Sequence, residues 1–290
     1  MWEAWIGQRH RWLPTLLLIP GLYGLAWLLM QPIAHLIPTL SQQTRDLSGT
    51  LISLLLFLAL LPSWVRIRWN SPHPWQQLGV CGGPGQDRRS WAFLRGLGWA
   101  TVLLLLLVAI SSIGSWGRGL WELSPANGWN ALLLCFGVGI AEELLFRGWL
   151  WGELDQLIGP RLALPGQALI FSLAHTRFNL GLWPMVGLLV GLFLFGLTLA
   201  IRRRLDRGSL WGCIGLHGGL VGGWFALQSG LMQLSPASPE WLTGPGGNPL
   251  GGLVGIIAMA GLLRIQLTAW ASAARPSTGA RRASSKGAKP

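Results

Sequence analysis

Long apolar runs recur along the chain, and short links between them hold most of the charged residues. Runs of about 20 apolar residues are typical of α-helices that cross a bilayer. The alternation over about ten residues that marks a membrane β-barrel strand is not seen. The pattern predicts an all-α polytopic membrane protein with about eight transmembrane helices, near residues 12–30, 48–64, 92–113, 129–151, 163–180, 182–201, 209–227 and 249–270.

The distribution of lysine and arginine supports this number of spans. If the N-terminus is cytoplasmic, the inner links carry nearly all of the basic residues, and the outer links hold only Arg45, Arg118 and Arg177. Cytoplasmic links of membrane proteins are enriched in Lys and Arg. We therefore expect an integral membrane protein with eight spans and with both termini in the cytoplasm.

Composition leads to the same class of protein. The chain is 51% hydrophobic and only 11% charged, whereas soluble domains carry roughly 25% charged residues. A net charge of +12 would suggest nucleic acid as a partner of a soluble protein, but here the basic residues lie in the links. They favour a role in topology, with the lipid bilayer as partner and no nucleic acid. Three cysteines without a CxxC pair indicate neither a disulfide framework nor a zinc finger.

The chain divides into a membrane-embedded domain, residues 1–270, and a tail, residues 271–290. The tail is small, polar, basic and rich in Pro and Gly, so we expect it to be disordered and to lie on the anionic inner leaflet. The first apolar run has no small-residue cleavage site and is expected to be an anchor helix. We find no internal repeat, which argues against a transporter built from two related halves.

Two acidic residues and two histidines lie inside the apolar runs, and they are the candidate functional residues. Glu142 and Glu143 are in the fourth run, His175 is in the fifth and His217 is in the seventh. Ionisable groups inside a bilayer cost several kcal/mol and usually mark function. At 1.5 Å per residue, Glu142, His175 and His217 lie roughly 12–18 Å from the inner surface. The sequence therefore predicts one buried polar site in the inner half of the bilayer.

Spacing separates the two carboxylates. Glu143 and Arg147 are four residues apart in the order that favours an intrahelical ion pair. Glu142 points about 100° away from Glu143 on a helix, so it is free to face a cavity. A bland alternative is that Glu143 and Arg147 clamp the helix and that Glu142 bonds a neighbouring helix.

The seventh run surrounds His217 with glycines. Gly215, Gly219 and Gly223 form a ladder of small residues that allows close helix packing. The same glycines also leave room for a substrate backbone. Cys213 lies four residues before His217, a spacing that suits a metal, but a lone cysteine inside the membrane is expected to be apolar filler.

These residues together resemble a known family. "EELLFR" (residues 142–147) fits an EExxxR motif, "FSLAH" (residues 171–175) fits FxxxH, and His217 stands where a third motif begins. Their order and spacing, over about residues 125–228, resemble the CAAX prenyl protease and bacteriocin-processing (CPBP, or Abi) family. The resemblance implies an intramembrane endopeptidase, a hydrolase whose substrate is a peptide or a membrane-protein segment.

The resemblance also implies roles for individual residues. Glu142 is the expected catalytic carboxylate, His175 its partner in activating water, and His217 the group that stabilises the oxyanion. Glu143 and Arg147, together with Phe171 of the FxxxH motif, are expected to support the site. The family is described both as metal-dependent and as glutamate-dependent without metal. In the metal-dependent version, Glu142, His175 and His217 surround a divalent ion such as zinc, and the sequence leaves both versions open.

One position departs from the family pattern. The last motif usually reads HxxxN or HxxxD, but Val221 stands four residues after His217. Valine cannot donate to an oxyanion, so either another group supplies this contact or activity is weakened. Asn179 is one candidate for the missing group. Val221 also favours a second hypothesis, a non-catalytic scaffold that binds a partner segment. A proton-coupled transporter that uses Glu142 and His175 as a relay is a third hypothesis.

Overall fold

The computed structural model describes residue 7 and residues 12–82 and 88–273, and it is almost entirely helical. Each of the eight predicted spans overlaps one main helix. These helices are α2 (Trp12–Leu36), α3 (Gln42–Trp69), α5 (Arg89–Ile113), α6 (Pro125–Glu142), α8 (Pro160–Ala174), α9 (Leu182–Leu205), α10 (Trp211–Ala226) and α12 (Leu253–Ala273). Helix α6 continues without a break through a π-helical segment, η1 (Glu143–Leu150), into α7 (Trp151–Ile158). The predicted all-α membrane architecture is thus confirmed.

Six helical stretches among the described residues are long and apolar enough to cross a membrane. They are residues 12–36, 42–69, 89–113, 125–158, 182–205 and 253–273. The two remaining predicted spans, α8 and α10, have 15 and 16 residues. Both are shorter than the roughly 20 residues that a full span requires. The predicted tail lies outside the described residues, except that its first three residues end α12.

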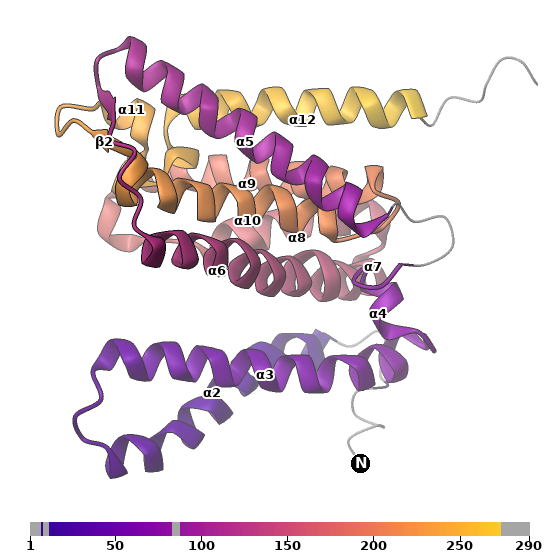
Figure 1. Ribbon diagram of the computed structural model, residues 1–290. Helices are drawn as coiled ribbons and strands as arrows, with labels where there is room; N and C mark the ends of the chain where they lie inside the picture. The colour runs from indigo at the N-terminus through magenta and orange to yellow at the C-terminus, as the bar shows by residue number, and fades with distance from the viewer. Residues whose placement is uncertain (1–6, 8–11, 83–87, 274–290) are drawn as a thin grey trace, which may run out of the picture.

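The connections between helices gather at two opposite ends of the bundle (Figure 1). We name the first the arginine-rich end, made of residues 66–80, 151–161 and 202–211, where α4 (Pro74–Gln77) and α7 lie. We name the second the hairpin end, made of residues 114–124, 176–181 and 232–252. It holds α11 (Glu240–Thr243) and two short antiparallel strands, β1 (Gly117–Gly119) and β2 (Met232–Leu234). The predicted inner links and the predicted outer links are therefore grouped separately in space.

A buried ion pair joins the α2–α3 hairpin to α7 at the arginine-rich end. Glu153 Oε2 lies 2.5 Å from Arg68 Nε, and both side chains are fully buried. The other carboxylate oxygen of Glu153 accepts from the indole nitrogens of Trp64 and Trp69, at 2.9 and 2.6 Å. Thr15 Oγ1 donates to Glu153 Oε2 as well. The sequence analysis placed only Glu142 and Glu143 among the buried acids and missed Glu153, because Glu153 follows the apolar run instead of interrupting it.

A second buried carboxylate, Asp206, closes the link between α9 and α10. It accepts from Arg202 Nη2 and Arg95 Nη2 at 2.6 and 2.7 Å. The neighbouring Arg203 donates to the backbone carbonyls of Arg147 and Leu78. These arginines are the predicted inner-link arginines, and their bonds join α9 to α5, to η1 and to the end of α4.

Helix α10 packs closely between α5 and α6, as its glycines predict. A Cβ atom at Gly215 or Gly219 would touch residues of α5, and one at Gly218 or Gly222 would touch the backbone of α6. Both faces of the helix therefore need glycine for close approach. This packing brings His217, in the middle of α10, up to Glu142 and Glu143.

Candidate active site

Glu142 is the last residue of α6 and lies at about the midpoint of the continuous helix 125–158. The π-helical segment begins directly after it. Segments of π-helix are rare and are found frequently at functional sites. Within this one, the carbonyl of Arg147 is bonded by the side chain of Arg203 from α9. The EExxxR motif is therefore held in an unusual backbone geometry at the centre of the bundle.

Glu143 and Arg147 form the predicted ion pair, with Glu143 Oε1 2.9 Å from Arg147 Nη1 and both side chains fully buried. The same oxygen, Oε1, lies 2.7 Å from His217 Nδ1. Glu143 therefore does more than hold its own helix: it also orients the histidine of α10. The sequence analysis did not predict this bond, because the approach of α10 is a tertiary contact.

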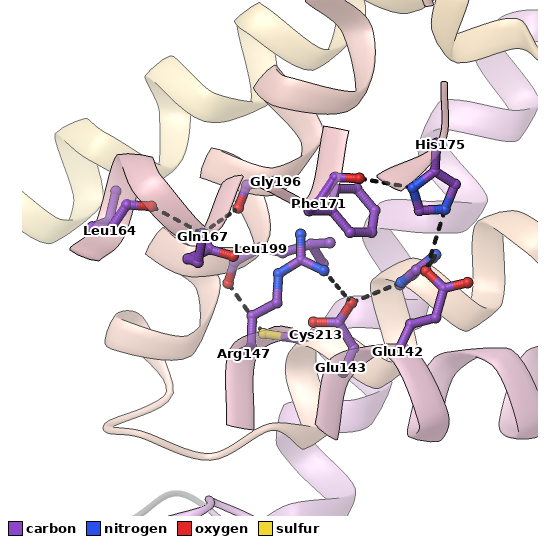
Figure 2. Close-up of polar contacts among 11 residues, drawn as sticks. Glu142, Glu143, Arg147, Leu164, Gln167, Phe171, His175, Gly196, Leu199 and Cys213 are labelled. Carbon is purple, nitrogen blue, oxygen red and sulfur yellow. Dashed lines mark hydrogen bonds and ion pairs between the residues drawn. The ribbon is translucent and has the colours of Figure 1, made fainter. Parts of the chain in front are cut away.

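His175 follows the last residue of α8. The sequence predicted a span over 163–180 with His175 inside it, but the helix begins at Pro160 and ends at Ala174. The physical reason lies in the hydrogen bonds of the last turn. The backbone N–H of His175 bonds to Ser172, and the carbonyl of Phe171 lies 2.8 Å from the ring atom Nδ1 of His175 (Figure 2). His175 thus stands nearer the hairpin end than the sequence numbering indicated.

Phe171 packs against the charged and imidazole side chains of the site, as the FxxxH motif suggests. Its ring centroid lies 4.1 Å from the guanidinium carbon of Arg147, a cation–π contact. The same ring packs against the imidazoles of His175 and His217, with centroids 4.8 and 5.8 Å apart. Phe195 of α9 covers His217 from another side, at 5.1 Å. The two histidines are therefore held by aromatic packing as well as by hydrogen bonds.

The three expected catalytic residues meet at one carboxylate oxygen. Glu142 Oε2 lies 3.5 Å from His175 Nε2 and 3.9 Å from His217 Nε2. This oxygen is buried and makes no hydrogen bond to the described residues. The side chains of Glu142 and His175 are 28% and 31% exposed, whereas that of His217 is 6% exposed. The site therefore contains a carboxylate that can be reached from a cavity and that has unused hydrogen-bonding capacity.

A cavity of about 370 Å³ opens in front of these residues. It is lined by Glu142, His175 and His217 at one end and by Gln228 and Asn248 at the other. Apolar side chains complete its walls: Leu104, Val138, Phe171, Leu192, Phe195, Leu220, Val221, Trp224, Pro249 and Leu250. A largely apolar cavity with a few convergent polar groups is the usual form of a ligand site.

Val221 lines this cavity, so the departure from the family motif faces the site itself. Asn179, the proposed replacement, is exposed in a 3-10 turn after α8 and is not among the lining residues. The sequence analysis did not single out three polar lining residues, Arg177, Gln228 and Asn248. They come from loops and a helix end, where neither periodicity nor a motif marks them.

The hydrogen bonds fix which ring nitrogen of each histidine carries the proton. The carbonyl of Phe171 can only accept, so Nδ1 of His175 is the donor. Glu143, ion-paired to Arg147, likewise accepts from Nδ1 of His217. In the neutral tautomer, both Nε2 atoms therefore present a lone pair toward Glu142. A water molecule at this point can donate to these acceptors.

The same atoms are the donor types of a catalytic zinc site, two imidazole nitrogens and one carboxylate. Each histidine also binds a protein acceptor through its other nitrogen, as metal-ligating histidines do. In their arrangement, however, the described residues contain no group of three His, Cys, Asp or Glu side chains that could hold a metal ion.

Two family models match separate parts of the chain. Residues 124–222 match the model of the type II CAAX prenyl endopeptidase Rce1-like family, which runs from the start of α6 into α10 and includes Glu142, His175 and His217. Residues 2–73 match a domain of unknown function, DUF8676, and contain the α2–α3 hairpin. Searches of curated proteins and of solved structures gave no match to the chain.

The fold and the site define a polytopic membrane protein in which a partly exposed carboxylate faces two histidines. Residues 124–222 match the Rce1-like family model, in agreement with the resemblance to the CPBP family that the motifs predicted. This match indicates a protease within the membrane.

Proposed function

We propose that the protein is an intramembrane endopeptidase that hydrolyses a peptide bond with water activated by Glu142 and His175. The observation that carries this proposal is the position of Glu142 Oε2, which is buried, lacks a hydrogen-bond donor among the described residues and lies close to two imidazole nitrogens beside a cavity. A structural carboxylate in an apolar interior is normally saturated with donors. This one is left available for a water and a substrate.

Peptide hydrolysis requires an attacking water, a stabiliser of the oxyanion and a proton for the leaving amine. A water between Glu142 Oε2 and His175 Nε2 gives up one proton as its oxygen attacks the carbonyl carbon. The proton acceptor, either Glu142 or His175, then returns that proton to the amine nitrogen when the C–N bond breaks. The products are a carboxylic acid and an amine, so atoms and protons balance.

His217 is the proposed oxyanion stabiliser, but its tautomer restricts how it acts. With Nδ1–H bonded to Glu143, the neutral ring has no proton on Nε2. His217 therefore donates to an oxyanion only as an imidazolium. Glu143 Oε1 lies 2.7 Å from Nδ1, so it is placed to pair with the ring in that form. Glu143 is a positioning residue that acts through His217.

A second function, a scaffold that holds a partner segment in the same cavity, is favoured by Val221. This side chain lines the site and offers no donor where the family usually has Asn or Asp. The two functions share the cavity and differ in whether Glu142 is required.

The experiment that separates them uses the purified protein in liposomes and a library of internally quenched peptides. We expect cleavage by the wild type and its loss in Glu142→Ala and His175→Ala proteins that keep their melting temperature. The exposed residues Glu240 and His73 provide matched controls, Glu240→Gln and His73→Ala. Undiminished cleavage by a folded Glu142→Ala protein contradicts the peptidase, whereas partner binding without cleavage in every variant supports the scaffold.

Chelation tests the metal separately. A mechanism without metal predicts that dialysis against a strong chelator leaves the cleavage rate unchanged. A loss of rate that added zinc restores would show that Glu142, His175 and His217 rearrange to bind a metal ion.

We also propose that both chain termini face the cytoplasm. The hairpin end holds only two arginines, Arg118 and Arg177, whereas the arginine-rich end holds seven: Arg66, Arg68, Arg161, Arg202, Arg203, Arg204 and Arg207. Such a bias in Lys and Arg normally marks the cytoplasmic side.

A further inference from the structure

The candidate site is closed toward the arginine-rich end. On the side of Glu142 and the histidines that faces the arginine-rich end, a layer of fully buried side chains fills the space between α6, α8, α9 and α10. The layer consists of Glu143, Arg147, Phe171, Leu199 and Cys213. Cys213 Sγ donates to the carbonyl of Leu199 within this layer. No cavity-lining residue comes from beyond it.

The backbone of residues 74–80 seals the bundle a second time at that end. Leu78 is fully buried, and Gly79 accepts a hydrogen bond from the backbone of Leu210, at the start of α10. The carbonyl of Val80 accepts from the indole of Trp211 at 2.9 Å. Arg203 also binds the carbonyl of Leu78. A peptide would have to break all of these bonds to reach Glu142 from the arginine-rich end.

The opposite end of the cavity is open. The exposed side chains among the lining residues are Arg177 and Gln228, and exposed Gly247 lies beside them. All three belong to the hairpin end or border it. Arg177 stands only two residues after His175 in the chain, so the path from solvent to the catalytic histidine is short.

One wall of this opening is a loop that descends into the bundle. A Cβ atom at Gly191 of α9, nine residues below the start of that helix, would strike the carbonyl of Leu250. The indole of Trp224 on α10 donates to the carbonyl of Gly247 at 3.0 Å. Non-helical backbone at this depth is tolerated where it is buried in protein or lines a water-filled cavity. The loop 244–252 does both, and it lines the cavity with polar atoms.

We propose that the substrate peptide enters through the hairpin end, past Arg177, Gln228 and Asn248, and that this end lies outside the cytoplasm. The substrate class is then a peptide segment exposed on the outer side of the membrane. This inference rests on the proposed peptidase function and on the proposed orientation. It also differs from the inner-half placement that the sequence suggested, because α8 ends at His175 and the cavity reaches residues 228–250.

The test measures water access to the cavity and not catalysis. In a Cys81→Ser background, where Cys135 and Cys213 are buried, Val221→Cys places a thiol in the cavity wall. Ala237→Cys marks the hairpin end and His73→Cys marks the arginine-rich end, since both native residues are exposed. A membrane-impermeant, charged thiol reagent is added to right-side-out and to inside-out vesicles that contain each protein.

We expect Val221→Cys and Ala237→Cys to react about tenfold faster or more in right-side-out vesicles, and His73→Cys in inside-out vesicles, because the bilayer excludes a charged reagent. Reaction of Val221→Cys from the side of His73→Cys would overturn the entry route. Failure to react from either side, while Ala237→Cys reacts, would also overturn it and would indicate an opening to lipid alone. Exchange of the two reference positions would overturn the outer location.

If Val221→Cys does not fold, Val138→Cys, which lines the same cavity from α6, gives the same measurement. Labelling is independent of cleavage. Loss of the peptidase hypothesis through an active Glu142→Ala protein therefore leaves the labelling result intact, and a wrong entry route leaves the catalytic residues intact.

Discussion

Two glutamates inside the bundle, the fully buried Glu153 and the partly exposed Glu142, show how a structural charge differs from the proposed catalytic one. Glu153 is completely buried and accepts from Arg68, Thr15, Trp64 and Trp69. Both oxygens are saturated, and the partners come from α2 and α3, far away in sequence. Glu142 has neither an arginine nor an indole on its carboxylate, and its Oε2 atom has no hydrogen bond to the described residues.

The difference is one of energy as well as geometry. A buried carboxylate without partners is costly, and removal of one partner from a buried pair typically destabilises a protein by about 3–5 kcal/mol. Glu153 avoids that cost by saturation. Glu142 instead lies beside a cavity, where water and substrate can solvate it. We therefore expect Glu153 to matter for stability and Glu142 to matter for rate.

The largest effect on cleavage is expected from a substitution of Glu142. Glu142→Gln keeps the volume of the side chain but removes the proton acceptor, so cleavage should fall by about 10²–10⁴-fold. The melting temperature should stay close to that of the wild type, because no hydrogen bond to Oε2 is lost. Parallel cleavage and thermal-unfolding measurements, with Glu240→Gln as control, check this. A large loss of stability in Glu142→Gln would place Glu142 with Glu153 as a structural charge.

The converse change is Glu153→Gln. It leaves Arg68 buried beside a neutral side chain, so we expect destabilisation of about 3–5 kcal/mol. The protein that remains folded should cleave at a nearly normal rate, since Glu153 does not line the cavity. The free energy of unfolding in detergent and the rate per folded molecule are the two measurements. An unchanged unfolding free energy would show that the α2–α3 hairpin is not held by this ion pair.

These two glutamates also show how far the sequence could predict the site. Glu142, Glu143 and Arg147 interrupt an apolar run. Because charged groups inside a bilayer are energetically costly, their presence there indicated a functional site. Glu153 lies just past the run in a segment with other polar residues and gave no such signal. Its partner Arg68 was interpreted only as a topological charge. The eight helices and the glycine packing of α10 follow from local patterns, which is why both were predictable.

Tertiary contacts explain what could not be predicted. The bond between Glu143 and His217 joins residues 74 positions apart, and no spacing rule applies at that separation. The end of α8 at Ala174 depends on the ring of His175 competing for the carbonyl of Phe171. The polar loop 244–252 reaches the cavity only because Gly191 lets it descend beside α9.

A smaller effect is expected at Glu143. This residue has both a structural and a functional role, because one of its oxygens binds Arg147 and His217. Glu143→Gln should lower kcat by about 100-fold with little change in KM, within the range seen when the carboxylate that orients a functional histidine is removed. Arg147→Lys is the matched comparison, since it leaves the bond from His217 to Glu143 in place. Equal losses of kcat and of stability in both variants would reduce Glu143 to a clamp of its own helix.

The smallest expected effect, and the one that sharpens the comparison most, is a gain at Val221. Position 221 lies one helical turn from His217 and lines the same cavity. Asparagine is similar in size to valine, so it should fit there. An oxyanion donor typically contributes about 10²–10³ in rate, but a side chain introduced without supporting contacts recovers only part of this. We therefore expect Val221→Asn to raise kcat on the order of tenfold, with Val221→Ala showing no gain because it only enlarges the cavity. A folded Val221→Asn protein with unchanged or lower kcat would mean that His217 alone serves the oxyanion, and that the valine is compatible with full activity.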